Sequence, residues 1–325
     1  MILGLIEHDR GALSPLSLQM LTLGRRLAEQ LGTELHAVLL GAVARPLAEQ
    51  LAAYGVATAH LADDARLDDW APEAWAQSVV ELIGAHGPQA LLAAGSERGN
   101  ELMAHVAARA GLALAANCLE VEPGEAYTIR RMRWGGSLLE EARLHGAVKL
   151  LTIAPHAVAA EPAAAPAAAA IREFAPALTE REFRVRVARR VAPARPGVSL
   201  ADARVVVGGG RGVGSAEGFA ALEQLAGLLG GAVGCSRAVT SVGWRPHADQ
   251  VGQTGTRIAP DLYIACGVSG AIQHMVGCKA AKRILAVNTD PEAPMVVQAH
   301  YAIIGDLHKV LPALCEAIRA QRERA

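Results

Sequence analysis

The stretch "VGQTGTRIAPDLYIACGVSGAIQH", Val251 to His274, predicts a strand, a tight turn and the beginning of a helix. Residues 262–266 form a short apolar run that is rich in strand-forming residues, which is typical of a buried strand. Gly267 and Gly270 then permit close approach of the backbone, and we expect Ser269 to cap the helix. A helix N-terminus attracts anions, so the stretch favours a phosphate-bearing ligand; an ordinary strand-to-helix turn is the alternative.

The length and composition indicate a two-domain α/β protein with a small ligand. A chain of 325 residues can form two domains with separate cores. Its 52% hydrophobic content with only 3% aromatic residues suits helices packed closely on sheets, and it disfavours base-stacking platforms. Because 31 basic residues nearly balance 32 acidic ones, we expect no nucleic acid partner and no binding to an anionic membrane.

The cysteines and the N-terminal region predict a soluble cytoplasmic protein without a metal site. The five cysteines form no CxxC pair and stand singly in apolar sequence, as buried thiols do in a reducing compartment. A charged cluster, Glu7 to Arg10, follows the first six residues too early for a signal peptide. No apolar run reaches the roughly 20 residues that span a bilayer.

Strand-like and helical patterns alternate along both halves of the chain. This order predicts an α/β fold of two domains, each a mostly parallel sheet with helices on both faces. The Pro/Gly-rich segment near Pro196 is the expected boundary, which gives domains 1–195 and 196–325. The Ala/Pro-rich segment, residues 161–170, is interpreted as a spacer or a long loop.

Small or polar residues follow four predicted strands of the second half. Ligands of open parallel sheets gather beyond the carboxyl ends of the strands, so these four ends are expected to converge. The glycine-rich loop "VVVGGGRGVGSAEG", Val205 to Gly218, is one of them, although it lacks both the GxGxxG spacing and the Gly-Lys-Ser/Thr of a P-loop. Arg211 inside it would add a bidentate partner for phosphate; a glycine turn with a solvated arginine is the alternative.

The remaining polar candidates of this half are residue types that bind a ligand, not ones that cleave a bond. Ser236 and Arg237 follow a predicted strand, where the arginine either meets an anionic or aromatic partner or lies at the surface. His274 has apolar neighbours along its helix and is either a ligand or a core histidine bonded to backbone. Thr254, Gln273 and Asn288 are neutral hydrogen-bonding side chains. No HExxH, GxSxG or PCxxC motif is present, so we expect no catalytic residue and a site that tunes a cofactor.

A series of motifs resembles the electron transfer flavoprotein alpha subunit family. The C-terminal motifs span residues 205–314, and the N-terminal half is similar more loosely in "GLIEHDRGALSPLSLQMLTLGRRLAEQLG" and "LLAAGSERGNELMAHVAARAGL". The C-terminal series, in order, is "GGRGVGS", "GCSRA", "VGQTG", "APDLYIACGVSGAIQH", "AVNTDPEAP" and "GDLHKVLPAL". The resemblance implies an FAD-binding C-terminal domain and an N-terminal domain that packs on a beta subunit.

The function implied by the resemblance is that of an electron carrier without substrate turnover of its own. The carrier would accept electrons from flavin dehydrogenases, such as those of fatty acid or amino acid oxidation, and a membrane quinone oxidoreductase would receive them. Two other readings stay open. One is a nucleotide- or NAD-binding α/β enzyme with His274 as acid or base, and the other is a regulatory module that binds an adenine nucleotide without turnover.

The resemblance also implies the cofactor contacts. Arg237 is expected against the isoalloxazine, Thr254 near N5, and His274 near the pyrimidine carbonyl that gains charge on reduction. A cation about 4 Å from that charge stabilises the reduced flavin by roughly 1 to 4 kcal/mol. This stabilisation raises the one-electron reduction potential by about 40 to 170 mV. The implied FAD contacts are Arg211, Ser236, Arg237, Val251, Gly252, Gln253, Thr254, Ser269, Gly270, Ala271, Ile272, Gln273, His274, Asn288, Asp306 and Leu307.

The chain departs from the family pattern at four positions outside these motifs. Gly208 stands where serine is frequent, and Ser137 stands where asparagine is common. Asn117 and His300 each occupy a position that commonly carries aspartate. Because Asn117 and Ser137 lie in the half expected to pack on the beta subunit, these departures bear on partner choice more than on FAD binding.

Overall fold

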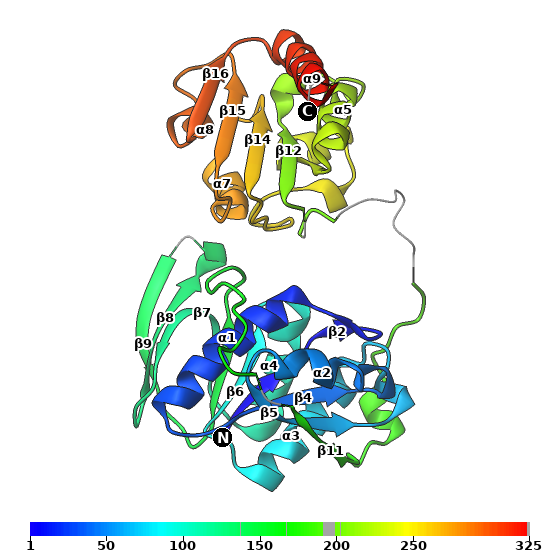
Figure 1. Ribbon diagram of the computed structural model, residues 1–325, viewed down its shortest axis with the longest axis vertical. Helices are drawn as coiled ribbons and strands as arrows, with labels where there is room; N and C mark the ends of the chain where they lie inside the picture. The colour runs from blue at the N-terminus through cyan, green and yellow to red at the C-terminus, as the bar shows by residue number, and fades with distance from the viewer. Residues whose placement is uncertain (137, 167, 191–198, 202, 324–325) are drawn as a thin grey trace. The chain divides into compact units, whose positions relative to one another are not determined.

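A computed structural model describes residues 1–136, 138–166, 168–190, 199–201 and 203–323 of the chain (Figure 1). The chain forms two compact units, Met1–Val191 and Ala192–Ala325. The predicted boundary between residues 195 and 196 lies outside the described residues, as does Ser137. The predicted α/β class is confirmed in each unit by large parallel sheets with helices on both faces.

The first unit is built on a nine-stranded sheet. All neighbouring strands are parallel except in the meander of β7 (Leu114–Glu122), β8 (Tyr127–Arg133) and β9 (Leu138–Leu144), whose two pairings are antiparallel (Figure 1). A two-stranded antiparallel ribbon, β2 (His8–Asp9) with β3 (Ala12–Leu13), follows β1. In spatial order the nine strands are β11 (Ala170–Phe174), β5 (Val56–Ala62), β4 (Leu35–Leu40), β1 (Ile2–Leu5), β6 (Ala90–Ala94), β10 (Lys149–Ile153), β7 (Leu114–Glu122), β8 (Tyr127–Arg133) and β9 (Leu138–Leu144).

Four helices cover the two faces of this sheet. Helices α1 (Pro15–Gln30) and α2 (Leu47–Ala52) pack on one face, and α3 (Pro72–His86) and α4 (Glu97–Ala110) pack on the other. Local sequence sets their ends. Pro72 begins α3, whereas Ser96 caps α4 by accepting a hydrogen bond from the Gly99 amide at 2.9 Å. Each sheet face therefore buries its apolar residues, and the inner strands β1, β4 and β6 are buried at every position.

The Ala/Pro-rich segment lies inside the first unit. Apart from residue 167 it is a described loop, and its last residue, Ala170, begins the edge strand β11 beside β5. Glu161 ties the loop to α1, since its amide donates to Thr22 Oγ1 at 3.0 Å and its carboxylate lies 2.7 Å from Arg26 Nη2. Strand β11 is absent from the sequence prediction because most of its side chains are exposed, so it carries no burial pattern.

The second unit is built on a five-stranded sheet in which every pairing is parallel. Its spatial order is β13 (Ala232–Cys235), β12 (Val205–Gly209), β14 (Leu262–Cys266), β15 (Ile284–Asn288) and β16 (Tyr301–Ile304). One face packs on α5 (Phe219–Leu229) and α9 (Leu307–Glu323); the other packs on α7 (Ile272–Cys278) and α8 (Pro294–Val297). The predicted convergence of four strand ends is confirmed, because β13, β12, β14 and β15 are parallel neighbours.

The turn after β14 differs in one detail from the prediction. Helix α7 begins at Ile272 after Ala271, with no side-chain hydrogen bond at its cap, so the predicted Ser269 cap is wrong. Gly270 is the reason, since its φ of 84° keeps the backbone out of the helical region. A Cβ at Gly270 would also lie 2.3 Å from the Met295 amide nitrogen. Glycine here lets the turn pack on α8.

Among the described residues, none of the helices combines the length and the apolar character needed to cross a bilayer.

Candidate functional site

Two glycine loops cross at the carboxyl ends of β12 and β14. A Cβ on Gly210 would lie 2.1 Å from the Gly267 carbonyl oxygen, and one on Gly212 would lie 2.7 Å from the Gly267 Cα. The Gly210 amide donates to the Cys266 carbonyl at 2.9 Å, and the Gly212 amide donates to the Gly267 carbonyl at 3.1 Å. The glycines thus permit a backbone crossing, and these two amides bond within the protein instead of facing a ligand.

A polar cleft opens beside this crossing. It has a volume of about 390 Å³ and lies at the ends of four adjacent strands. The strand order reverses between β12 and β14, which is the point where open α/β sheets bind their ligands. We call this the Arg211 cleft. Its lining residues are Arg211, Gly212, Ser236, Ala238, Gly267, Ser269, Asn288, Asp290 and Ala293.

The Arg211 cleft has the donors that a phosphate group requires. Arg211 is exposed at its rim, and Ser236 and Ser269 bring hydroxyl groups from two different strand ends. Asn288 is held in place because its amide donates to the Val268 carbonyl at 3.0 Å. Four of the predicted FAD contacts therefore lie together in one cleft, as the sequence predicts.

A second cleft begins one residue further along the chain. Ser236 lines the Arg211 cleft, whereas Arg237, the first residue of the short helix α6 (Arg237–Ser241), lines a cleft of about 360 Å³. We call it the Arg237 cleft, and Thr254 lines it too. Its other lining residues, absent from the sequence prediction, are Thr240, Ser241, His247 and Gln250.

Gln250 organises the Arg237 cleft. Its side chain is buried and accepts a hydrogen bond from Thr240 Oγ1 at 2.8 Å, while its amide donates to Thr254 Oγ1 at 3.0 Å. This bridge fixes the position of Thr254, a predicted flavin contact. The sequence carries a weak signal for it, since Gln250 directly precedes the "VGQTG" motif.

His274 lines neither cleft. It is 6% exposed on α7, and its Nε2 lies 2.8 Å from the hydroxyl of Tyr263. Desolvation by burial lowers the pKa of His274 to about 4, so the imidazole is neutral at pH 7. His274 is therefore a neutral hydrogen-bonding group, and the guanidinium of Arg237 supplies a permanent positive charge to the Arg237 cleft.

The other predicted contacts line neither cleft. The loop 251–254 packs on α7, where the Gln253 amide donates to the Gln273 carbonyl at 2.7 Å. Ala271, Ile272 and Gln273 are exposed at the beginning of α7. Asp306 begins α9 by accepting a hydrogen bond from the His308 amide, and the side chain of Leu307 is buried in the core. Neither Asp306 nor Leu307 lines either cleft.

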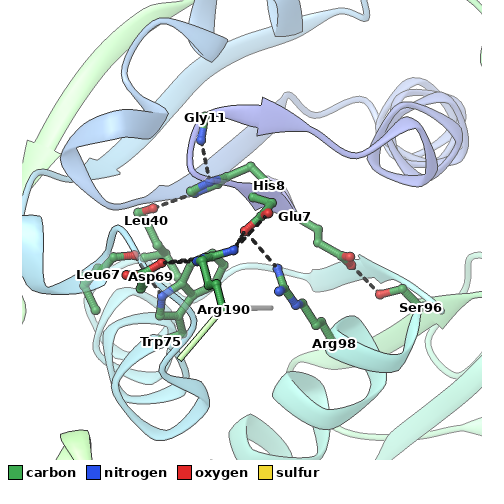
Figure 2. A network of polar contacts seen from close by, with 11 residues as sticks. Glu7, His8, Gly11, Leu40, Leu67, Asp69, Trp75, Ser96, Arg98 and Arg190 are labelled. Carbon is green, nitrogen blue, oxygen red and sulfur yellow. Dashed lines mark hydrogen bonds and ion pairs between the residues drawn. The ribbon is translucent and has the colours of Figure 1, made fainter. Parts of the chain in front are cut away.

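The corresponding position of the first unit is closed. Its strand order reverses between β1 and β6, and a cavity of only about 10 Å³ remains there, enough for at most one water molecule. Figure 2 shows a network of polar contacts that includes Glu7, Trp75 and Arg98 of the cavity lining. In this network Arg190 lies 2.5 Å from Asp69 and 3.0 Å from Asp9, and Glu7 accepts a hydrogen bond from Ser96.

An acidic group faces this closed position. Burial raises the pKa of Glu7, although the Ser96 hydroxyl and the nearby Arg98 oppose that effect. Arg98 itself lies over the ring of Trp70, 5.3 Å from its centroid. A buried carboxyl group and a cation already stacked on tryptophan are unsuited to an anionic ligand, so the phosphate chemistry belongs to the second unit.

Comparison with known proteins agrees with this division. A family model of the electron transfer flavoprotein domain matches residues 2–179, and a model of the electron transfer flavoprotein FAD-binding domain matches residues 199–279. The electron transfer flavoprotein subunit alpha of Mycobacterium tuberculosis (strain H37Rv) is 39% identical over 323 residues, 99% of each chain. Protein FixB of Bradyrhizobium diazoefficiens is 37% identical over 323 residues, which are 97% of this chain and 88% of that protein.

The fold, the two clefts and these matches define an electron-transfer flavoprotein with FAD as the cofactor of its second unit. The clefts fit that cofactor, because one offers phosphate donors and the other a cation beside neutral hydrogen-bonding groups. More particularly, the chain belongs to the electron transfer flavoprotein alpha subunit family. An alpha subunit implies a beta subunit as its partner.

Proposed function

We propose that this chain is the FAD-carrying alpha subunit of a cytoplasmic heterodimer that accepts electrons from flavin dehydrogenases. A membrane quinone oxidoreductase is the acceptor, and the chain turns over no substrate of its own. The observation that carries this proposal is the pair of clefts at the carboxyl edge of the second sheet, in which Ser236 and Arg237 are consecutive residues. One cofactor with a pyrophosphate and a flavin could occupy both.

The proposed FAD contacts follow from the chemistry of each cleft. Arg211, Ser236, Ser269 and Asn288 bind the pyrophosphate and ribose part, because their side chains combine a cation with neutral donors and acceptors. Arg237 and Thr254 bind the isoalloxazine. The remaining proposed contacts are Val251, Gly252, Gln253, Gly270, Ala271, Ile272, Gln273, His274, Asp306 and Leu307.

Arg237 supplies the electrostatic part of the function. FAD, when bound, supplies the reversible acceptance of electrons, and the protein determines how favourable that acceptance is. The guanidinium of Arg237 is always charged, so it stabilises negative charge that develops nearby. Asp290 lines the Arg211 cleft, whereas the lining residues of the Arg237 cleft include no carboxylate.

The two units divide the work in this proposal. Residues 1–195 form the domain that packs on the beta subunit, and residues 196–325 form the FAD domain. Support comes from the closed position at β1 and β6, which leaves the first unit without space for a nucleotide there.

A visible absorption spectrum of the chain co-purified with its beta subunit tests the proposal. We expect bound flavin, and stepwise anaerobic reduction should remove its colour through a one-electron stage. Addition of a flavin dehydrogenase and its substrate should reduce the same flavin. A complex that is colourless and takes up no added FAD contradicts the proposal, and it would favour a nucleotide-binding enzyme instead.

A further inference from the structure

An exposed histidine lines the Arg237 cleft together with Arg237 itself. It is His247, the first residue of a short 3-10 helix, His247–Asp249. Histidine is the side-chain type whose charge changes most readily between about pH 5 and 8. Hydroxyl and carboxamide groups do not ionise in that range, and they complete the lining at Thr240, Ser241, Gln250 and Thr254. His247 is therefore the lining residue through which pH can change the charge of this cleft.

The backbone is anchored on both sides of His247. Two residues before it, Arg245 has a side chain that is 9% exposed and lies 2.5 Å from Glu223 of α5. The same guanidinium lies 2.7 Å from Asp249, two residues after His247. The Gln250 amide then donates to the His247 carbonyl at 2.9 Å. Because these contacts fix the backbone, the imidazole is kept at the wall of the cleft.

The charged groups around His247 are few. Helix α6 and strand β13 pack on the 3-10 helix, and α6 contributes the cation Arg237. From β13 comes Cys235, a neutral thiol because burial raises its pKa to about 12. The carboxylate of Asp249 is paired with Arg245. Protonated His247 would thus be a second positive charge in a cleft whose lining residues include no carboxylate.

We propose that His247 faces the cofactor and couples the uptake of a proton to reduction of the flavin. The inference rests on the proposed function, because that function assigns the isoalloxazine to the Arg237 cleft. An electron from a flavin dehydrogenase adds one negative charge to the cofactor, and His247 takes up a proton from solvent; no bond between them forms or breaks. Since a protonated imidazole stabilises this charge, the affinity of the flavin for its first electron rises as the pH falls.

Variants with a fixed charge at this position test the coupling in the FAD-loaded heterodimer. His247→Gln is neutral at every pH, whereas His247→Arg is always charged. The matched control is His308→Gln, which replaces an exposed histidine of α9 that lines neither cleft. The readout is the midpoint potential of the flavin for its first electron, from about pH 5.5 to about pH 8.5, at low and high salt.

The wild type should change from the behaviour of one variant to that of the other. Near the alkaline limit it should match His247→Gln, and near the acidic limit it should match His247→Arg. The two variants should differ by about three- to tenfold in electron affinity, which is about 28 to 59 mV. Added salt should reduce this difference because His247 is exposed. His308→Gln should follow the wild type. A difference between wild type and His247→Gln that is absent, or the same at every pH, overturns the inference.

Chemical modification of His247 gives a second readout that needs no electron transfer. Diethyl pyrocarbonate acylates accessible imidazoles, so bound FAD should protect His247 and leave His308 reactive. Equal modification of His247 with and without FAD overturns the inference. A heterodimer that stays colourless with added FAD contradicts the proposed function and the inference together, whereas a yellow heterodimer without the pH-dependent difference contradicts the inference alone.

Discussion

The two units have similar sheets but differ at the point where the strand order reverses, which is open in the second unit and filled with side chains in the first. In the second unit, glycine loops and Arg211 border a cleft of about 390 Å³. In the first unit, Glu7, Trp70 and Trp75 leave a cavity of about 10 Å³. The fold therefore provides the location of a ligand site, whereas the residues directly after the strands decide whether a ligand fits.

Disrupting the crossing of the two glycine loops should have the largest effect on stability and on FAD binding. In Gly210→Ala the new Cβ would meet the Gly267 carbonyl oxygen at 2.1 Å, so the loops must separate. We expect about 3 kcal/mol or more of lost stability, together with loss of FAD. Thermal unfolding and retained flavin absorbance measure both effects.

Gly227→Ala is the matched control for that substitution. Gly227 lies within α5, and a Cβ there would meet no atom within 4 Å. Replacing an unconstrained helical glycine should stabilise the second unit by about 0.4 to 1 kcal/mol, with FAD retained. A Gly210→Ala protein as stable and as yellow as this control would contradict the close crossing.

Arginines at the two strand-reversal points should differ in their effect on FAD. Arg211→Ala removes a charged donor from the open cleft, which should raise the Kd for FAD by about 10- to 100-fold, or about 1.5 to 3 kcal/mol. Arg98→Ala at the closed position should leave the Kd unchanged. Titration of the FAD-free complex with FAD, followed by flavin fluorescence, measures this difference. Equal effects of the two substitutions would contradict the assignment of the Arg211 cleft as the FAD site.

Ion-pair networks of the two units should differ by their burial. Arg245, with a side chain 9% exposed in the second unit, lies 2.5 Å from Glu223 and 2.7 Å from Asp249. Because Glu223 is itself 40% exposed, Arg245→Ala should cost about 1 to 2 kcal/mol of unfolding free energy. Arg190→Ala, which breaks the exposed pairs with Asp9 and Asp69, should cost less, and added salt should abolish that smaller effect. Urea unfolding at low and high salt measures the unfolding free energy of both variants. Equal losses of unfolding free energy would contradict the expected effect of burial.

Buried histidines should destabilise both units in acid. Burial lowers the pKa of His274 to about 4; the pKa of His60 is also about 4, from burial and then from its neighbours His36, His86 and Arg172. Since these folded-state values lie below the unfolded value of about 6.5, the unfolded chain binds more protons between pH 6.5 and 4, and stability falls as the pH falls. We expect the free energy of unfolding to fall by about 2 kcal/mol per histidine between pH 7 and 5.

His60→Gln separates the two contributions. His60→Gln should reduce the loss of unfolding free energy that the first unit shows between pH 7 and 5, and it should leave the second unit unchanged. The fluorescence of Trp70 and Trp75 reports unfolding of the first unit, and that of Trp244 reports unfolding of the second. An unchanged pH dependence of the first unit would show that His60 is protonated in the folded state.

Local sequence was sufficient for most elements and for the donors of the Arg211 cleft. Most strands with apolar side chains on both faces were predictable, whereas β5, β7, β11, β16 and the β2–β3 ribbon were not. Strand β5 contains three alanines and a histidine, and β11 and β16 lie largely exposed, so pairing with neighbours, not intrinsic pattern, defines them. The Ser269 cap failed because the local signal ignores the constraint that α8 places on Gly270.

The sequence by itself determined the α/β class, the glycine loop with its arginine, and the resemblance that points to FAD. The tertiary structure alone decided the strand order, the closing of the first unit and the neutral state of His274. Strand order depends on pairing between segments far apart in the chain, which no local pattern encodes. Burial, likewise, is a property of everything packed around a group, and it is burial that makes His274 a neutral partner of Tyr263.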